Sequence, residues 1–361
     1  MNRIIIISFC FLASFTCLHI KAQVFVIERG SSFLTYKTIG TAINALQDDD
    51  ILYIPPGVHD IAGMTWKGYN GAGNFTNTLA ITKKVTIIGA GYWVPDKSST
   101  IANSGSGVGV FVLTENASGS VITGIRFETE LRFDHVSNIQ MDRCGANQAT
   151  YFGGTGENNI LTECTFSPIT KGSSSYRSGG SGVSVVANKC TFWSTTTQFH
   201  SSTVWNSNFF MISYSNNNYF VADNSYFWNN IFIHNDPTNV LSSNRNFGLQ
   251  QVNNSVFNNN LWVSVGAIDS HGSNTFTKNM TATSVDNVFT NYSAGDYRLL
   301  STCVGKNAGT DGTDVGIYGT QVPFKTNRLP FVPHIIMDKK LLYTDGDGKL
   351  PVNITIEAQE N

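Results

Sequence analysis

The chain has 361 residues, a length that suits either two ordinary domains or one elongated repeat structure. Charged residues make up 13% of it, about half the usual share of roughly 25%, and the formal net charge is −2. This balance excludes the basic surface of a nucleic-acid-binding protein. The 41% hydrophobic content, with 24 phenylalanines, provides enough apolar surface for a folded core.

The first 22 residues have the features of a secretory signal peptide. Arg3 precedes an apolar stretch, residues 4–18, and Ala22 ends a segment suited to cleavage before Gln23. The stretch is shorter than the ~20 residues that a spanning helix needs, so we expect residues 1–22 to be removed and no stable membrane span to remain. The alternatives are an uncleaved anchor and, because of Cys17, a lipoprotein. The mature protein is expected outside the cell, at its surface or in the periplasm.

One helix and two short strands come next. Residues 36–46 have apolar side chains at helical spacing, with Thr38 as the N-cap; these positions are Ile39, Ala42, Ile43 and Leu46. Residues 51–54 and 85–88 are apolar runs closed by Pro-Pro-Gly and Gly-Ala-Gly, which is typical of buried strands. The second of these turns lacks the third glycine and the helix of a dinucleotide-binding loop.

Further apolar runs follow with no helical period between them. They occupy residues 110–113, 121–127, 138–141 and 183–186. Strands without intervening helices argue against a doubly wound α/β sheet and favour an all-β sandwich, barrel or solenoid.

Internal repetition favours the solenoid. Residues 224–232 (NSYFWNNIF) match residues 254–262 (NSVFNNNLW) at an offset of 30, and Cys164 matches Cys190 at an offset of 26. Periods of this size are typical of stacked repeats. We expect aromatic rings to stack inside, asparagines to form ladders at the turns, and Cys144 to join the other two cysteines as buried, unreactive side chains.

The opening and closing segments carry a family resemblance. Residues 36–91 combine the helix with DDDILYIPPGVHD and KKVTIIGAG, and residues 286–289, 296–299 and 314–318 are similar to closing coils of bacterial members. Together they resemble the pectate-lyase-like superfamily of right-handed parallel β-helices. The resemblance implies an all-β solenoid over residues 23–320 with an N-terminal capping helix. It implies a carbohydrate-related role only loosely, because the fold hosts lyases, hydrolases, epimerases and adhesins.

The composition changes in residues 321–361. Pro323, Pro330 and Pro333 predict an extended segment. Residues 341–344 and 350–356 could pair across Asp-Gly-Asp-Gly as a hairpin that covers the open edge of the last coil.

The motifs exclude hydrolysis of the polygalacturonase type and leave a polysaccharide lyase reaction open. The resemblance to polygalacturonases would imply a Gly-His-Gly motif, but Ser270 precedes His271 here, and no Arg-x-Lys is present. A polysaccharide lyase needs a base and a calcium ion or arginine that neutralises a uronate carboxylate. Such residues need only project from neighbouring coils, so their spacing does not exclude a lyase.

Two short segments that each contain a histidine and an aspartate follow predicted strands, at residues 234–236 (HND) and 269–271 (DSH). Their histidines are 37 residues apart. If these turns align, they line one cleft, with Arg177, His234 and His271 as catalytic residues and Asp236 and Asp269 as calcium ligands. The alternative is two polar loops of turn-forming residues. Other candidates in the middle coils are Arg126, Arg132, His135, Arg143, Lys171, His200 and Arg245, with acids Asp134, Asp142 and Asp223.

Aromatic side chains could offer platforms for sugar rings; the candidates are Tyr176, Trp193, Tyr214, Tyr219 and Trp228. Two functions remain open at this point. The first is a secreted polysaccharide lyase, or a protein that binds an acidic polysaccharide. The second is a non-catalytic surface, adhesive or glycan-binding protein.

Overall fold

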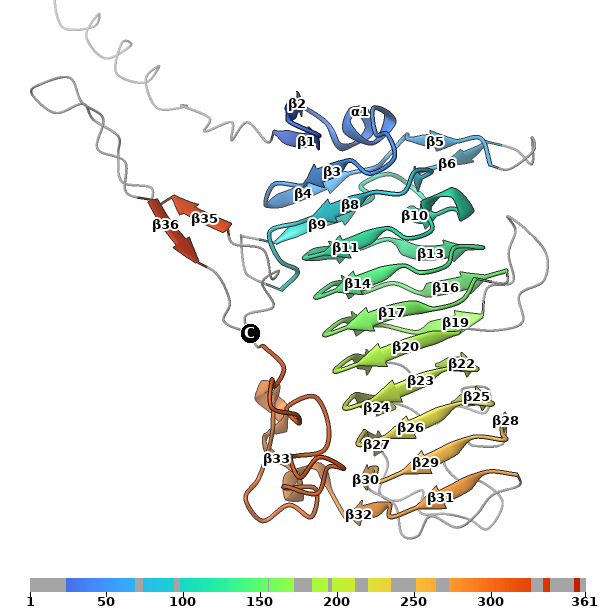
Figure 1. Cartoon of the computed structure of the whole chain (residues 1–361), viewed down its shortest axis with the longest axis vertical. Helices are drawn as coiled ribbons and strands as arrows, with labels where there is room; N and C mark the ends of the chain where they lie inside the picture. The colour runs from blue at the N-terminus through green and yellow to red at the C-terminus, as the bar shows by residue number, and fades with distance from the viewer. Residues whose placement is uncertain are drawn as a thin grey trace, which may run out of the picture.

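The computed structural model of the chain is mostly β-structure, with long stacks of parallel strands (Figure 1). It describes residues 24–68, 74–93, 98–154, 156–171, 184–193, 197–211, 220–234, 251–263, 273–325, 334–337 and 354–357. The predicted signal peptide lies outside this range. No helix in the described part of the chain is long and apolar enough to cross a membrane.

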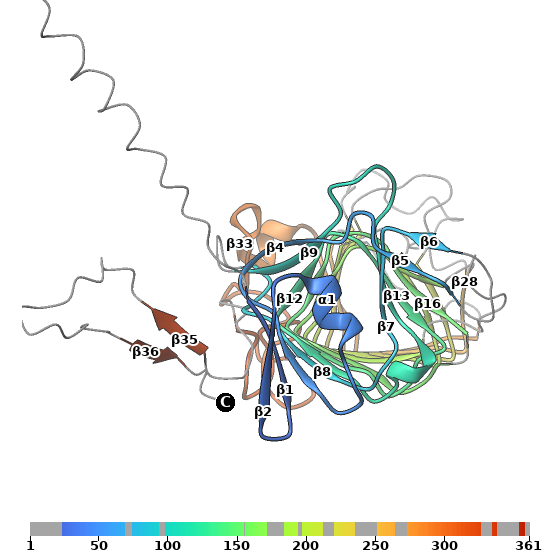
Figure 2. The same ribbon diagram turned by 90° about the horizontal axis from the view of Figure 1, so that it is seen from above.

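The described chain begins with an antiparallel pair and a short helix. Strand β1 (Phe25–Arg29) pairs with β2 (Ser32–Tyr36) and with β3 (Ile51–Tyr53). Helix α1 spans Ile39–Asn44, and the side chain of Thr38 accepts the N–H of Thr41 at its start. Its start after Thr38 is as predicted, and it ends at Asn44, with Ala45 as the C-cap, two residues before the predicted Leu46. In Figure 2 α1 lies across one end of the strand stacks.

The first long sheet joins one strand from each successive repeat, all parallel beyond β3. Its members are β3, β8 (Thr86–Ile88), β11 (Val121–Thr123), β14 (Gln140–Asp142), β17 (Asn159–Thr162), β20 (Val185–Asn188), β23 (Thr203–Trp205), β26 (Tyr226–Trp228), β29 (Val256–Asn258) and β31 (Thr275–Thr277).

The second sheet is built in the same way, and its strands follow those of the first in the chain. Its members are β4 (Gly57–Asp60), β9 (Ser99–Ala102), β12 (Ile125–Phe127), β15 (Gly145–Ala146), β18 (Thr165–Phe166), β21 (Thr191–Trp193), β24 (Asn208–Met211), β27 (Ile231–His234), β30 (Leu261–Val263) and β32 (Met280–Ala282).

The remaining strands form a third side and a small hairpin. The third sheet contains β7 (Thr78–Ile81), β10 (Val110–Leu113), β13 (Glu130–Asp134), β16 (Thr150–Gly153) and β19 (Ile169–Lys171), and a further sheet contains β22 (Gln198–His200), β25 (Val221–Asp223) and β28 (Gln251–Asn253). The hairpin pairs β5 (Thr65–Trp66) with β6 (Phe75–Thr76). We call a rung the set of consecutive strands that one repeat contributes to the different sheets. This arrangement is consistent with a parallel β-helix.

The register confirms the repeats read from the sequence. Phe227 pairs with Phe257 and Phe232 with Trp262, so residues 30 apart lie on neighbouring rungs. Their rings stack with centroids 4.9 and 4.3 Å apart. Such pairs, repeated through the interior, form the main core.

The corner before each second-sheet strand carries a ladder of side chains. The backbone N–H of Ser207 donates to Asn230 Oδ1, and that of Asn230 donates to Asn260 Oδ1, each at 2.9 Å. Earlier rungs place cysteine at this position, and the three are buried and free: Cys144, Cys164 and Cys190. The predicted asparagine ladder and buried thiols are confirmed.

After β32 the chain folds back along the outside of the second sheet, beside β27 to β32 (Figure 1). It forms η2 (Val285–Asn287), β33 (Phe289–Asn291), η3 (Tyr292–Ala294) and β34 (Asp296–Leu299), and β33 pairs antiparallel with β34. We call residues 285–325 the C-terminal segment. The last strands of the two long parallel sheets are β31 and β32.

The hairpin at the end of the chain uses a different first strand from the one predicted. Strand β36 (Ile354–Glu357) pairs antiparallel with β35 (His334–Met337). The predicted partner, residues 341–344, lies outside the described residues.

Candidate functional site

The outer face of the second sheet changes from polar to apolar along the rungs. Side chains alternate between the two faces of a β-strand. On each rung of the second sheet, the residue that follows the buried aromatic ring, or that follows Ala146, therefore points outward. Successive rungs present Glu128, Asn147, Ser167, Trp193, Phe210, Ile233 and Val263. The C-terminal segment covers the apolar half, where Ile233 and Val263 cluster with Val288 and Phe289.

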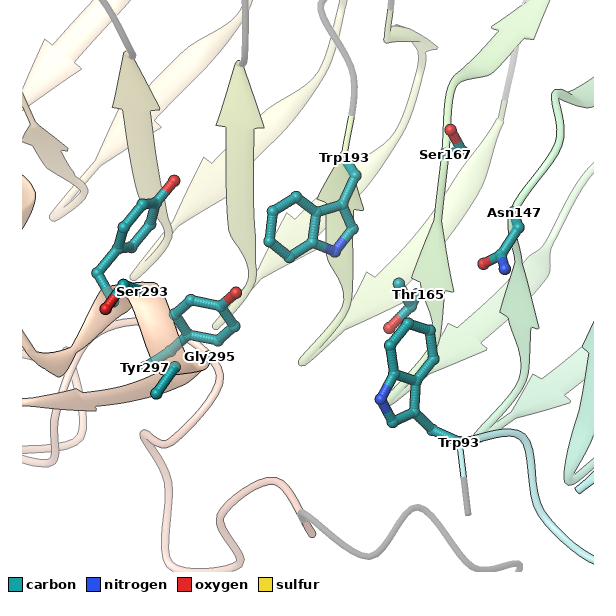
Figure 3. Close-up of a pocket in the computed structure, with 10 residues that line it drawn as sticks. Trp93, Asn147, Thr165, Ser167, Trp193, Ser293, Gly295 and Tyr297 are labelled. Carbon is teal, nitrogen blue, oxygen red and sulfur yellow. The ribbon is translucent and has the colours of Figure 1, made fainter. Parts of the chain in front are cut away.

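A groove lies at the edge of the C-terminal segment, over the polar part of the outer face of the second sheet. It has a volume of about 710 Å³ and is lined by Trp93, Asn147, Thr165, Ser167, Trp193, Tyr292, Ser293, Ala294, Gly295 and Tyr297. Figure 3 shows Tyr297 and Trp193 at the left and centre, Trp93 beside Thr165, and Ser167 and Asn147 on the strands farther to the right.

The Trp193 side of the groove is a packed aromatic group. Trp193 stacks on Phe210 with ring centroids 3.9 Å apart and planes at 7°. Tyr297 lies 4.8 Å from Phe210 and 6.0 Å from Trp193. This wall therefore combines a strand of the second sheet with the C-terminal segment, and the two hold each other in place.

The opposite side is positioned by the buried side chain of Tyr92. The phenol oxygen of Tyr92 lies 3.2 Å from Thr165 Oγ1, and its ring lies against Gly145, where a Cβ would be only 2.5 Å from it. Glycine is therefore required at this point of β15. With Tyr92 anchored, the next residue, Trp93, remains 51% exposed at the groove.

One ion pair lies beside Trp93. The guanidinium carbon of Arg126 is 5.3 Å from the centre of the Trp93 ring, within cation–π range. Arg126 also pairs with Glu128, and Glu128 Oε1 accepts Asn147 Nδ2 at 2.8 Å. Glu128 therefore already compensates the positive charge of Arg126 at the Trp93 end of the groove.

The groove's tyrosine at η3 is not suited to act as a base. Burial raises the pKa of Tyr292, so its phenol stays protonated at neutral pH. The lining residues offer indole, phenol, hydroxyl and amide groups, which donate and accept hydrogen bonds without carrying charge.

The predicted catalytic and calcium-binding residues are not brought together by anything the structure describes. Arg177, His271, Asp236 and Asp269 lie outside the described residues. His234 ends β27 and pairs with Met211 along the backbone, and its side chain is outside the description. Within the described chain, no group of three His, Cys, Asp or Glu side chains is arranged to hold a metal ion.

Other basic candidates have acidic partners of their own. His200 Nδ1 lies 3.3 Å from Asp223 Oδ2, and His135 Nδ1 lies 2.8 Å from Asp134 Oδ1. Arg132 pairs with Glu130 on the third sheet, and the fully buried Arg143 pairs with Glu163. These pairs are outside the groove lining.

The sequence identified one groove residue, Trp193, among its aromatic candidates. Trp228, also proposed, instead stacks on Trp205 on the first sheet, with centroids 5.3 Å apart. Trp93, Asn147 and Tyr297 had been missed. They come from three distant parts of the chain, and the stacking of the rungs together with the packing of the C-terminal segment brings them to one surface.

No protein-family model matches the chain, and the comparison with curated proteins gives no match.

Proposed function

We propose that the chain is a secreted, right-handed parallel β-helix protein of the pectate-lyase-like kind that binds a polysaccharide in the groove on its second sheet. The observation that carries this is the pairing of two indoles that line the groove, the exposed Trp93 and the half-buried Trp193, with a floor of small polar residues. The parallel stacks support the fold, and the strong right-handed preference of parallel crossovers supports its hand.

The chemistry of the groove suits a sugar chain. A pyranose ring has an apolar C–H face and a rim of hydroxyls. The first can pack on the indoles of Trp93 and Trp193, which present large rigid apolar surfaces. The second can exchange hydrogen bonds with Asn147 and Ser167, as the few polar groups of a ligand groove do.

Polysaccharide cleavage is a further step that the same protein can be tested for. A lyase reaction would take its base from Arg177, His234 or His271 and would use a calcium ion held by Asp236 and Asp269. Binding is the primary proposal because the described lining contains no histidine, lysine or carboxylate.

The test is retardation of the mature protein in native gels that contain one polysaccharide each. We expect at least one polymer to retard the wild type, Trp93→Ala to migrate freely, and Trp228→Ala to behave as wild type. Absence of retardation by every polymer, or equal loss in both variants, contradicts the proposal. Absorbance of an unsaturated product, with calcium or with a chelator, reports lyase activity in the same samples.

A further inference from the structure

We infer that the groove selects an uncharged glycan and binds it as an extended oligosaccharide across at least three rungs. This inference rests on the proposed function and specifies the ligand class of the same groove. It departs from the acidic polysaccharide expected from the sequence.

None of the ten residues that line the groove is charged. Two arginines that lie beside lining residues, in space or in sequence, are paired with acids. Arg126 pairs with Glu128 beside Trp93, and Arg298 pairs with Asp296 next to Tyr297 through two hydrogen bonds of 2.8 and 2.6 Å. The described residues that line the groove therefore offer no positive charge to attract an anion.

Binding a uronate in this groove would carry a desolvation cost. A polyuronate carries a carboxylate on every sugar, and a carboxylate moved against aromatic rings without a cation loses solvation that nothing replaces. The charge of Arg126 is already shared with Glu128, so a uronate bound beside it would face a second carboxylate close by. Hydroxyls need no counter-charge, and the neutral donors and acceptors of Asn147, Thr165 and Ser167 suit them.

The spacing of the strands matches an extended glycan. Asn147 and Ser167 directly follow β15 and β18, and Trp193 ends β21, and these three strands are stacked in register. Parallel strands are about 4.8 Å apart, close to the length that one sugar adds to an extended glycan. Each rung can therefore contact one sugar, and an oligosaccharide gains contacts with each unit that a monosaccharide cannot make.

The experiment compares polymers that share a backbone and differ in charge. The probes are hydroxyethyl cellulose against carboxymethyl cellulose, methyl-esterified against de-esterified polygalacturonate, and xylan against glucuronoxylan, each at about 0.02 M and 0.5 M NaCl. Wild type, Arg126→Gln and Trp193→Ala are compared by gel retardation. The bound polymer is then cut into oligosaccharides of increasing length for calorimetric titration.

We expect tighter binding of an uncharged polymer, no more than about twofold change with salt, a loss of at least about tenfold in Trp193→Ala, and rising affinity up to three sugars or more. Preference for the charged member, weakened by salt and by Arg126→Gln, would overturn the inference while leaving glycan binding intact. Affinity that is complete with one sugar would overturn the extended mode. No binding to any probe would contradict the proposed function itself.

Discussion

Trp193 and Phe210 stack face to face on neighbouring strands of the second sheet, with ring centroids 3.9 Å apart and planes at 7°. They lie where the outer face changes from polar to apolar. Phe210 is 1% exposed beneath the C-terminal segment, while Trp193 lines the groove. One aromatic pair thus serves both the attachment of that segment and the surface on which we expect a sugar ring to lie.

Comparison of Trp193→Ala with Trp193→Phe should separate these two roles. We expect Trp193→Ala to weaken glycan binding by at least about tenfold, or about 1.4 kcal/mol, because the ring face is lost. Trp193→Phe keeps a ring over Phe210 and should retain most of the stability and part of the affinity. Trp228→Ala removes a similar stack from the first sheet and serves as the control. Equal affinity losses in the Trp193→Ala and Trp228→Ala variants would count against the groove.

A second prediction concerns Gly145, against which the ring of Tyr92 packs. A Cβ there would lie 2.5 Å from the ring, so Gly145→Ala should cost about 1–3 kcal/mol of unfolding free energy and should displace Trp93. Gly153 is a matched control, because its Cβ would meet nothing nearer than 3.7 Å. Chemical denaturation measures both variants. A harmless Gly145→Ala would show that Tyr92 does not fix this side of the groove.

The sequence anticipated the interior of this molecule better than its surface. Inward residues repeat with the rungs, so Phe227 and Phe257 could be aligned from the chain alone, and the register confirms them. The residues that line the groove do not repeat along the sequence in this way. Trp93 lies in a loop after β8, and Tyr297 belongs to a segment that folds back from beyond the last rung. Their proximity depends on how the C-terminal segment packs, which no local pattern encodes.

The buried ion pair at the corner between the first two sheets gives a third prediction. Arg143 Nε lies 2.8 Å from Glu163 Oε2, and the two side chains are 0% and 3% exposed. Glu163→Gln leaves a buried guanidinium without its counter-charge and should cost about 3–5 kcal/mol. The exposed pair of Lys84 with Asp49 is the control, and Asp49→Asn should cost less than about 1 kcal/mol. Similar unfolding midpoints for the two variants would contradict the prediction.

Asp142 gives a fourth prediction, through pH. Burial on the first sheet raises the pKa of Asp142 to about 6, above its ordinary value of 3.8. The folded state therefore holds the proton more tightly than the unfolded state, so the contribution of Asp142 to stability falls as pH rises from about 4 to about 6. Asp142→Asn stays neutral and keeps a partner for Gln140.

The variant should therefore be more stable than wild type above pH 6, by up to about 3 kcal/mol, and the difference should shrink toward pH 4. Unfolding in urea at a series of pH values measures it. A stability difference that does not vary with pH, or that grows as pH falls, would contradict the raised pKa.

The most direct test of the account is hydroxyl-radical footprinting, read by mass spectrometry, with and without a saturating uncharged oligosaccharide. The groove predicts several-fold slower oxidation of Trp93 and Tyr297 in the complex. Tyr226, which is 54% exposed on the outer face of the first sheet, should react at the same rate in both samples. Protection of Tyr226 with no change at Trp93 would place the glycan on a different face and contradict the account.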